Sequence, residues 1–157
     1  MSKRLIVLLA GVVAIAALAA GCGSGDDSTE ATVELTKVEF IAQGDAICEK
    51  GSRQIEDEAD AFAEENDIDT SSPSKAEQEE VIASVLAPAL QDQADELSAL
   101  AAPSGDEEQT EAIFEALEAG VERLEDEPAS LLESGAGPLE EANKLASAYG
   151  FKACGQE

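Results

Sequence analysis

The feature that most limits the fold of this chain is an apolar residue at every seventh position in its first half. Ile41, Cys48, Ile55 and Phe62 recur at this spacing, with Ala59 on the same side. Seven residues make about two turns of an α-helix, so these side chains share one face. The segment therefore predicts a long amphipathic helix with one stripe directed at a core.

Both ends of this first helix are marked in the sequence. Thr36 and Glu39 have the spacing of a capping box, and Leu35 and Phe40 have that of a hydrophobic staple. Asn66 stands where the helix is expected to end, before a polar loop.

A second helix is expected from Ser74, which forms a capping box with Glu77, to about residue 100. Pro88 falls inside this apolar pattern. Because proline removes one backbone donor and clashes with the preceding turn, we expect a kink rather than two separate helices.

A third helix is expected after a further capping box, formed by Ser104 and Glu107, and should stop before Pro128. A short turn near Leu131 and Leu132 then follows. These features separate the third helix from the last one.

The fourth helix is predicted to open with Pro138 as its first residue. Gly150 is placed to be its left-handed C-cap, with Phe151 making the accompanying apolar contact. Four amphipathic helices without a credible strand predict an all-α fold, an antiparallel four-helix bundle.

The N-terminus has the organisation of an export signal. Lys3 and Arg4 precede an apolar run over residues 5–20, which is shorter than the ~20 residues that a membrane-spanning helix needs. Residues 19–21 are Ala, Ala and Gly, and Cys22 follows. This stretch resembles the lipobox of bacterial lipoproteins. The resemblance implies that residues 1–21 are a cleaved signal peptide, that Cys22 is lipidated, and that the protein is anchored on the extracytoplasmic face of the cell membrane.

The other two cysteines fit this location. With Cys22 assigned to the lipid, Cys48 and Cys154 remain as a pair in a compartment where disulfides persist. A bond between them would place the end of the fourth helix beside Cys48, so that residues 36–47 overhang or pack on the middle helices. Their spacing is far from a CxxC pattern, which argues against redox catalysis and zinc binding.

Composition distinguishes a tether from the helical domain that follows it. Residues 22–35 are mainly small and polar and are expected to form a flexible tether, with residues 36–157 as an acidic helical domain.

Removal of residues 1–21 leaves seven basic against 35 acidic residues, a net charge of −28. Such a field repels nucleic acid, and it also keeps a tethered domain soluble.

Two segments of the sequence also resemble a type of small actinobacterial lipoprotein. They are residues 40–48, Phe-Ile-Ala-Gln-Gly-Asp-Ala-Ile-Cys, and residues 149–155, Tyr-Gly-Phe-Lys-Ala-Cys-Gly. The resemblance covers only the two ends of the domain and implies relatives rather than a function.

The composition excludes several kinds of catalysis. The chain has no histidine, so Ser-His and Cys-His catalysis and imidazole metal sites are impossible from this chain alone. Two serines lie near lysines, but Ser74 with Lys75 is interpreted as a helix cap and Ser147 with Lys144 as a helix surface. No catalytic residue, metal site or cofactor is therefore predicted.

Carboxylates are the one abundant functional group. Asp67, Asp69 and Ser71 have the alternating spacing of a calcium loop, but Ser72 stands where that loop needs glycine, and Gln78 where it needs glutamate. A solvated loop is the favoured interpretation.

Two classes of function remain. The favoured one is a non-enzymatic envelope lipoprotein that interacts with another envelope protein or with cell-wall material. The alternative is a lipoprotein that holds a small ligand or cations between its helices. A deep apolar pocket with inward polar groups favours the alternative, and a filled core favours the first class.

Overall fold

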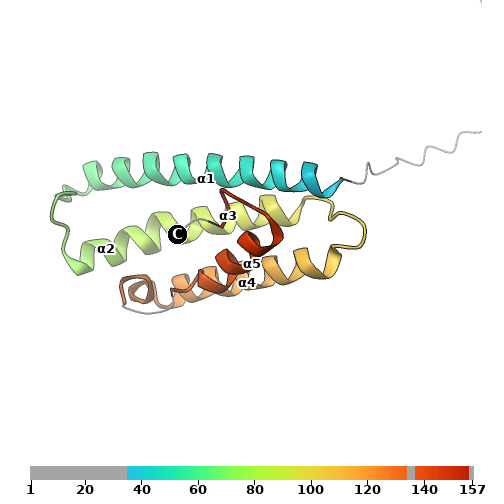
Figure 1. Cartoon of the computed structure of the whole chain (residues 1–157). Helices are drawn as coiled ribbons and strands as arrows, with labels where there is room; N and C mark the ends of the chain where they lie inside the picture. Colours follow the sequence, from blue (N-terminus) through green and yellow to red (C-terminus); the bar gives the residue numbers. More distant parts are fainter. Residues whose placement is uncertain (1–34, 134–136, 156–157) are drawn as a thin grey trace, which may run out of the picture. The chain divides into compact units, whose positions relative to one another are not determined.

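The computed structural model describes residues 35–133 and 137–155, and within these ranges the chain is helical, without a strand. The expected signal peptide, Cys22 and nearly all of the expected tether lie outside the described residues. The helical elements are α1 (Lys37–Glu65), α2 (Lys75–Val81), η1 (Ile82–Leu86), α3 (Ala87–Ser98), α4 (Glu107–Asp126), η2 (Pro128–Leu132) and α5 (Glu140–Tyr149) (Figure 1). The predicted all-α class is confirmed.

Helix α1 begins and ends where its caps predict. The backbone N–H of Glu39 donates to Thr36 Oγ1 at 3.3 Å, and the N–H of Thr36 donates to the Glu39 carboxylate at 3.0 Å. Leu35 packs against the apolar cluster that contains the buried Phe40, in agreement with a hydrophobic staple. At the other end, Asn66 is the C-cap and its N–H donates to the carbonyl of Phe62.

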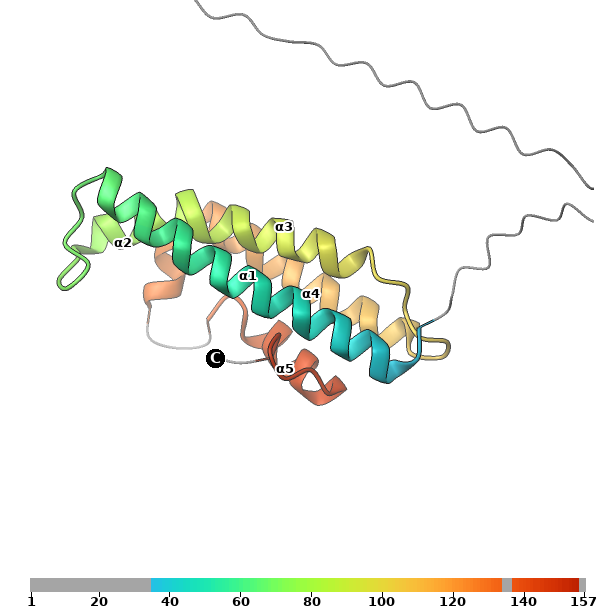
Figure 2. The same cartoon turned by 90° about the horizontal axis from the view of Figure 1, so that it is seen from above.

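The second helical run is continuous through α2, η1 and α3 (Figure 2). Its N-terminus has the predicted capping box of Ser74 with Glu77. A π-helical segment, η1, ends two residues before Pro88, and the N–H of Ala87 donates to the carbonyl of Ile82, five residues earlier. Since Pro88 has no N–H and its ring crowds the preceding turn, the wider π turn lets the helix continue without a break.

The expected capping box of Ser104 and Glu107 is wrong. Ser104 lies in a turn, and Asp106 precedes α4 without a side-chain cap. Gly105 has a φ of +87°, and its N–H donates to the Glu107 carboxylate at 2.8 Å. The Glu107 carboxylate therefore accepts from the N–H of Gly105 and not from that of Ser104, as a capping box would require.

The last helix also starts later than predicted. Pro138 lies in a turn, and α5 begins at Glu140 with Leu139 at the N-cap position. Its C-terminus is as expected: Gly150 has a φ of +123°, and the N–H groups of Gly150 and Phe151 both donate to the carbonyl of Ala146. Phe151 is buried in the same apolar cluster as Ala146, which completes the cap.

The helices form a bundle around a shared core. Helix α3 packs against α1 and α4, and α5 packs against α4 (Figures 1 and 2). Residues 36–47 pack rather than overhang, because the fully buried Phe40 lies within 6.0 Å of Tyr149 and 5.8 Å of Phe151, measured between ring centroids. No helix among residues 35–133 and 137–155 is long and apolar enough to cross a membrane.

A glycine sets the distance between α4 and the start of α5. Gly120 is buried in α4, and a Cβ atom there would lie 2.6 Å from the carbonyl oxygen of Pro138 and 2.8 Å from Leu139 Cδ2. The backbone before α5 can lie directly on α4 only because this side chain is absent.

We predict that Gly120→Ala lowers the free energy of unfolding by ~1–3 kcal/mol, because the backbone at Pro138 must move away from α4. Gly51→Ala is the matched control, since its Cβ meets only the flexible end of Gln93. That change should be neutral or stabilising by up to ~1 kcal/mol from helix propensity. Urea denaturation of both variants measures the difference, and equal effects would contradict the packing described for Gly120.

Candidate functional site

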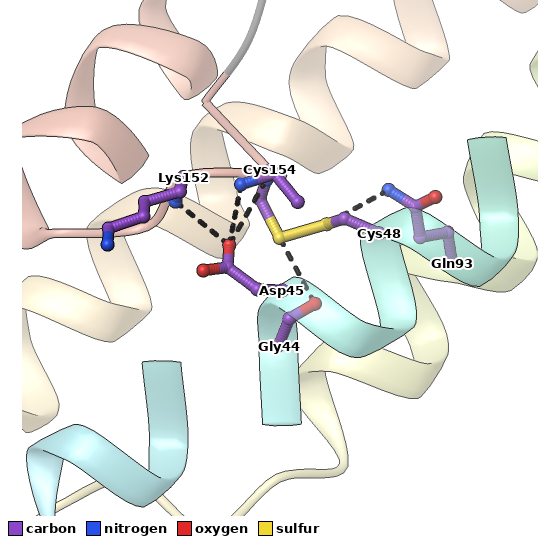
Figure 3. Close-up of a disulfide and its surroundings, with 7 residues drawn as sticks. Gly44, Asp45, Cys48, Gln93, Lys152 and Cys154 are labelled. Atoms are coloured by element: carbon purple, nitrogen blue, oxygen red, sulfur yellow. Dashed lines mark hydrogen bonds between the residues drawn. A yellow bond between two sulfur atoms is a disulfide. The ribbon is translucent and has the colours of Figure 1, made fainter. Parts of the chain in front are cut away.

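The segment that follows α5 is bound to the N-terminal half of α1 by a disulfide. Cys48 and Cys154 are joined, with their Cα atoms 5.2 Å apart and a sequence separation of 106 (Figure 3). The predicted pairing is confirmed. The left-handed turn at Gly150 allows the chain to leave α5 and reach α1.

A carboxylate on α1 holds the same terminal segment. Asp45 Oδ1 accepts the backbone N–H groups of Lys152 at 2.9 Å, Ala153 at 2.8 Å and Cys154 at 3.4 Å (Figure 3). This arrangement satisfies consecutive N–H groups that follow a helix and have no helical partner. Asp45 was not singled out in the sequence, although it belongs to one of the two segments that carry the lipoprotein resemblance, and those two segments contact each other.

Beside the disulfide lies a cavity of about 150 Å³, here called the central cavity. Most of its lining side chains are apolar and come from α1, α3, α4, α5 and the terminal segment, while Ser52, Gln93 and Asn143 supply polar groups. Gln93 Nε2 donates to Cys48 Sγ at 3.5 Å (Figure 3). A volume of this size admits a molecule like benzene but is below the ~300–1,000 Å³ typical of ligand sites.

A second concavity, the distal groove, lies at the end of the bundle where the loop after α1 leads into α2 (Figure 1). Its volume is about 320 Å³ and it is open to solvent. It is lined by Ala59, Asp60, Ala63, Ile68, Thr70, Pro73, Glu77, Gln78, Val81, Ile82, Leu131 and Leu132. Thr36 is at the opposite end of α1, so the groove lies far from the point where the preceding chain enters the bundle.

A polar cluster closes the other end of the bundle. The hydroxyl of Tyr149 donates to Asp106 Oδ2 at 2.8 Å, and Lys37 Nζ lies 3.4 Å from the same oxygen and 3.7 Å from the centroid of the tyrosine ring. Burial and the hydrogen bond to Asp106 raise the pKa of Tyr149 well above its ordinary value. The phenol therefore stays protonated into the alkaline range, and its hydroxyl remains a hydrogen-bond donor to Asp106.

Of the loop residues with calcium-like spacing, Asp69 and Ser71 are hydrogen-bonded to each other. Asp69 Oδ1 accepts the backbone N–H of Ser71 at 3.0 Å and its hydroxyl at 2.6 Å, and these hydrogen bonds lower the pKa of Asp69. Asp67 has a φ of +53°. In the part of the chain that the structure describes, no group of three or more His, Cys, Asp or Glu side chains is arranged to hold a metal ion.

The two serine–lysine pairs have structural partners. Ser74 caps α2, while Lys75 pairs with Glu79 at 3.5 Å. Ser147 Oγ donates to the carbonyl of Gly155 at 2.9 Å. The interpretation of Ser74 as a helix cap is confirmed.

We predict that Tyr149 keeps its proton in the folded protein above pH ~10, where an unfolded tyrosine ionises. A raised folded-state pKa means that the associated stability is complete below pH ~10 and is lost as the pH rises further. Tyr149 is the only tyrosine and tryptophan is absent, so near-ultraviolet absorbance reports this phenol alone. Ionisation should coincide with unfolding in circular dichroism, and Asp106→Asn should bring it to lower pH. Ionisation near pH 10 with an intact helical spectrum would contradict the buried hydrogen bond.

We also predict that Asp45→Ala lowers the free energy of unfolding of the oxidised protein by ~1–3 kcal/mol, because consecutive N–H groups lose their acceptor. Asp45→Asn should cost less, since its amide oxygen still accepts. Asp57→Ala, at an exposed position of the same helix, is the control. Thermal melts compare the three variants, and equal stability of Asp45→Ala and Asp57→Ala would show that the carboxylate does not hold the terminal segment.

Comparison with models of protein families, with curated proteins and with solved structures finds no significant match to this chain.

Proposed function

We propose that this chain is a membrane-anchored extracytoplasmic lipoprotein, lipidated at Cys22, whose helical domain acts without catalysis by binding another envelope protein. The lipobox-like residues 19–22 support the anchor. The bond between Cys48 and Cys154 agrees with an oxidising compartment.

The observation that carries the interaction role is the position and character of the distal groove. It is open, lined mainly by apolar side chains, and located near the C-terminal end of the 29-residue helix α1. At 1.5 Å per residue this end is ~43 Å along the helix from Thr36, where the tether joins. A domain held through its tether thus offers this concavity away from the point of attachment.

The antiparallel order of the four helices is part of the same proposal. It is supported by the short connections over residues 66–74 and 99–106, each of which joins helical runs that pack on each other. Short connections favour antiparallel neighbours in helical bundles.

The described side chains also support a role without catalysis. Tyr149 is held protonated, Ser74 and Ser147 have structural hydrogen bonds, and the whole sequence lacks histidine. General acid–base catalysis near neutral pH most often uses histidine.

The alternative is a lipoprotein that binds a small ligand or cation, and the central cavity is the observation in its favour. Its polar residues, Ser52, Gln93 and Asn143, line a mainly apolar space of about 150 Å³. Native mass spectrometry of protein purified from its own host separates the two functions. A retained small molecule or metal supports the alternative, and a retained partner protein supports the proposed interaction role.

For the anchor, we predict that the native protein incorporates a clickable fatty acid and partitions into detergent. Cys22→Ser should abolish the label and block processing or release the protein, because the thiol is the site of lipid attachment. Cys48→Ser is the matched control, and it should keep the label because Cys48 is bonded to Cys154. An unlabelled, detergent-independent wild type would contradict the anchor.

A further inference from the structure

We propose that the distal groove binds a basic, amphipathic segment of another protein, with the apolar side chains of that segment in the groove and its cationic side chains over the surrounding carboxylates. This inference rests on the proposed interaction function and names the chemistry of the partner.

The apolar half of the argument comes from η2. Leu131 and Leu132 are each 37% exposed, and together with Val38 they are the large hydrophobic side chains that the described surface leaves exposed. They line the groove together with Ala63 of α1 and Val81 of α2. Apolar surface gathered in one concavity marks an interaction site more strongly than scattered single residues do.

The charged half comes from the segments that supply the lining. Residues 59–82 and 128–133 contain nine acidic residues and a single basic one, Lys75, which pairs with Glu79. Asp60 and Glu77 lie on the groove itself. Complementary charge around an apolar centre selects a basic partner and speeds its approach.

Other occupants fit less well. The tether at residues 23–34 has four acidic residues, no basic one and little apolar surface. A second copy of the chain brings the same negative charge and is repelled. The partner is therefore a different, positively charged protein segment, and a helix laid in a groove is a common form of such recognition.

The test uses the full chain in non-ionic detergent and a leucine–lysine peptide of ~15 residues, which forms an amphipathic helix ~22 Å long. The peptide carries a photo-crosslinking group on its apolar face, and the ionic strength is held near ~0.15 M to screen diffuse attraction. We expect saturable crosslinks within residues 59–82 and 128–133. A peptide of the same composition in scrambled order should give none.

Two variants of the chain probe the two halves of the site. The double variant Leu131→Ser and Leu132→Ser removes exposed apolar surface, and Asp60→Lys reverses a charge on the groove; each should weaken peptide binding about tenfold, equivalent to ~1.4 kcal/mol. The matched controls are Val38→Ser, an exposed apolar residue at the other end, and Glu49→Lys, the same charge reversal elsewhere on α1. Both should change binding less than about twofold, since hot spots are local.

Crosslinks spread over all helices, or equal losses in the test and control variants, would show that the acidic coat attracts the peptide without a site and would overturn the inference. Self-association that disappears in the leucine double variant would overturn it in favour of a second copy. If the peptide does not crosslink at the groove but Cys22 still carries the fatty-acid label, the result contradicts this inference and leaves the proposed anchor unaffected. Loss of the Cys22 label contradicts the anchor and leaves the result at the groove unchanged.

Discussion

The attachment of the chain's end to α1 is the constraint on which the packing of the Thr36 end depends. The disulfide closes a loop of about a hundred residues, for which the loop-entropy relation gives ~4.7 kcal/mol before any strain. Asp45 adds hydrogen bonds to the segment just before Cys154. Together they hold Phe151 against Phe40, and Gly44 leaves the space for the Phe151 ring, because a Cβ there would collide with it. The aromatic cluster of Phe40, Tyr149 and Phe151 thus depends on the disulfide, which holds the segment after α5 against α1.

Local features of the fold were predictable because their causes lie within a few residues. The capping boxes at Thr36 and Ser74 need only a side chain and a glutamate three positions later. The same rule failed at Ser104, because the chain turns at Gly105 and the N–H of Gly105 donates to the Glu107 carboxylate. The residue pattern alone does not reveal whether the Glu107 carboxylate accepts a hydrogen bond from the N–H of Ser104 or from that of Gly105.

Longer-range features were beyond sequence reasoning. Asp45 meets an N–H group 107 positions away, so only the folded chain reveals its role. The distal groove was missed for a similar reason: Leu131 and Leu132 were expected only in a turn, and the concavity needs α1, α2, η2 and the loop between the first two. The disulfide was predictable, because assignment of Cys22 to a lipid leaves one possible pair. The central cavity is lined by residues of α1, α3, α4, α5 and the terminal segment, and no single periodic pattern specifies how these pack together.

The closed covalent loop also determines what a single proteolytic cut can remove. Cleavage anywhere between residues 49 and 153 leaves both fragments joined through Cys48 and Cys154. The exposed loop after α1 and the turn at Gly105 both lie inside this loop, so nicking at either one releases nothing. A cut between Cys22 and Thr36 has the opposite effect, because it separates the whole helical domain from the proposed site of the anchor. Retention through the proposed anchor thus depends on the segment between Cys22 and Thr36, which the disulfide-closed loop does not include.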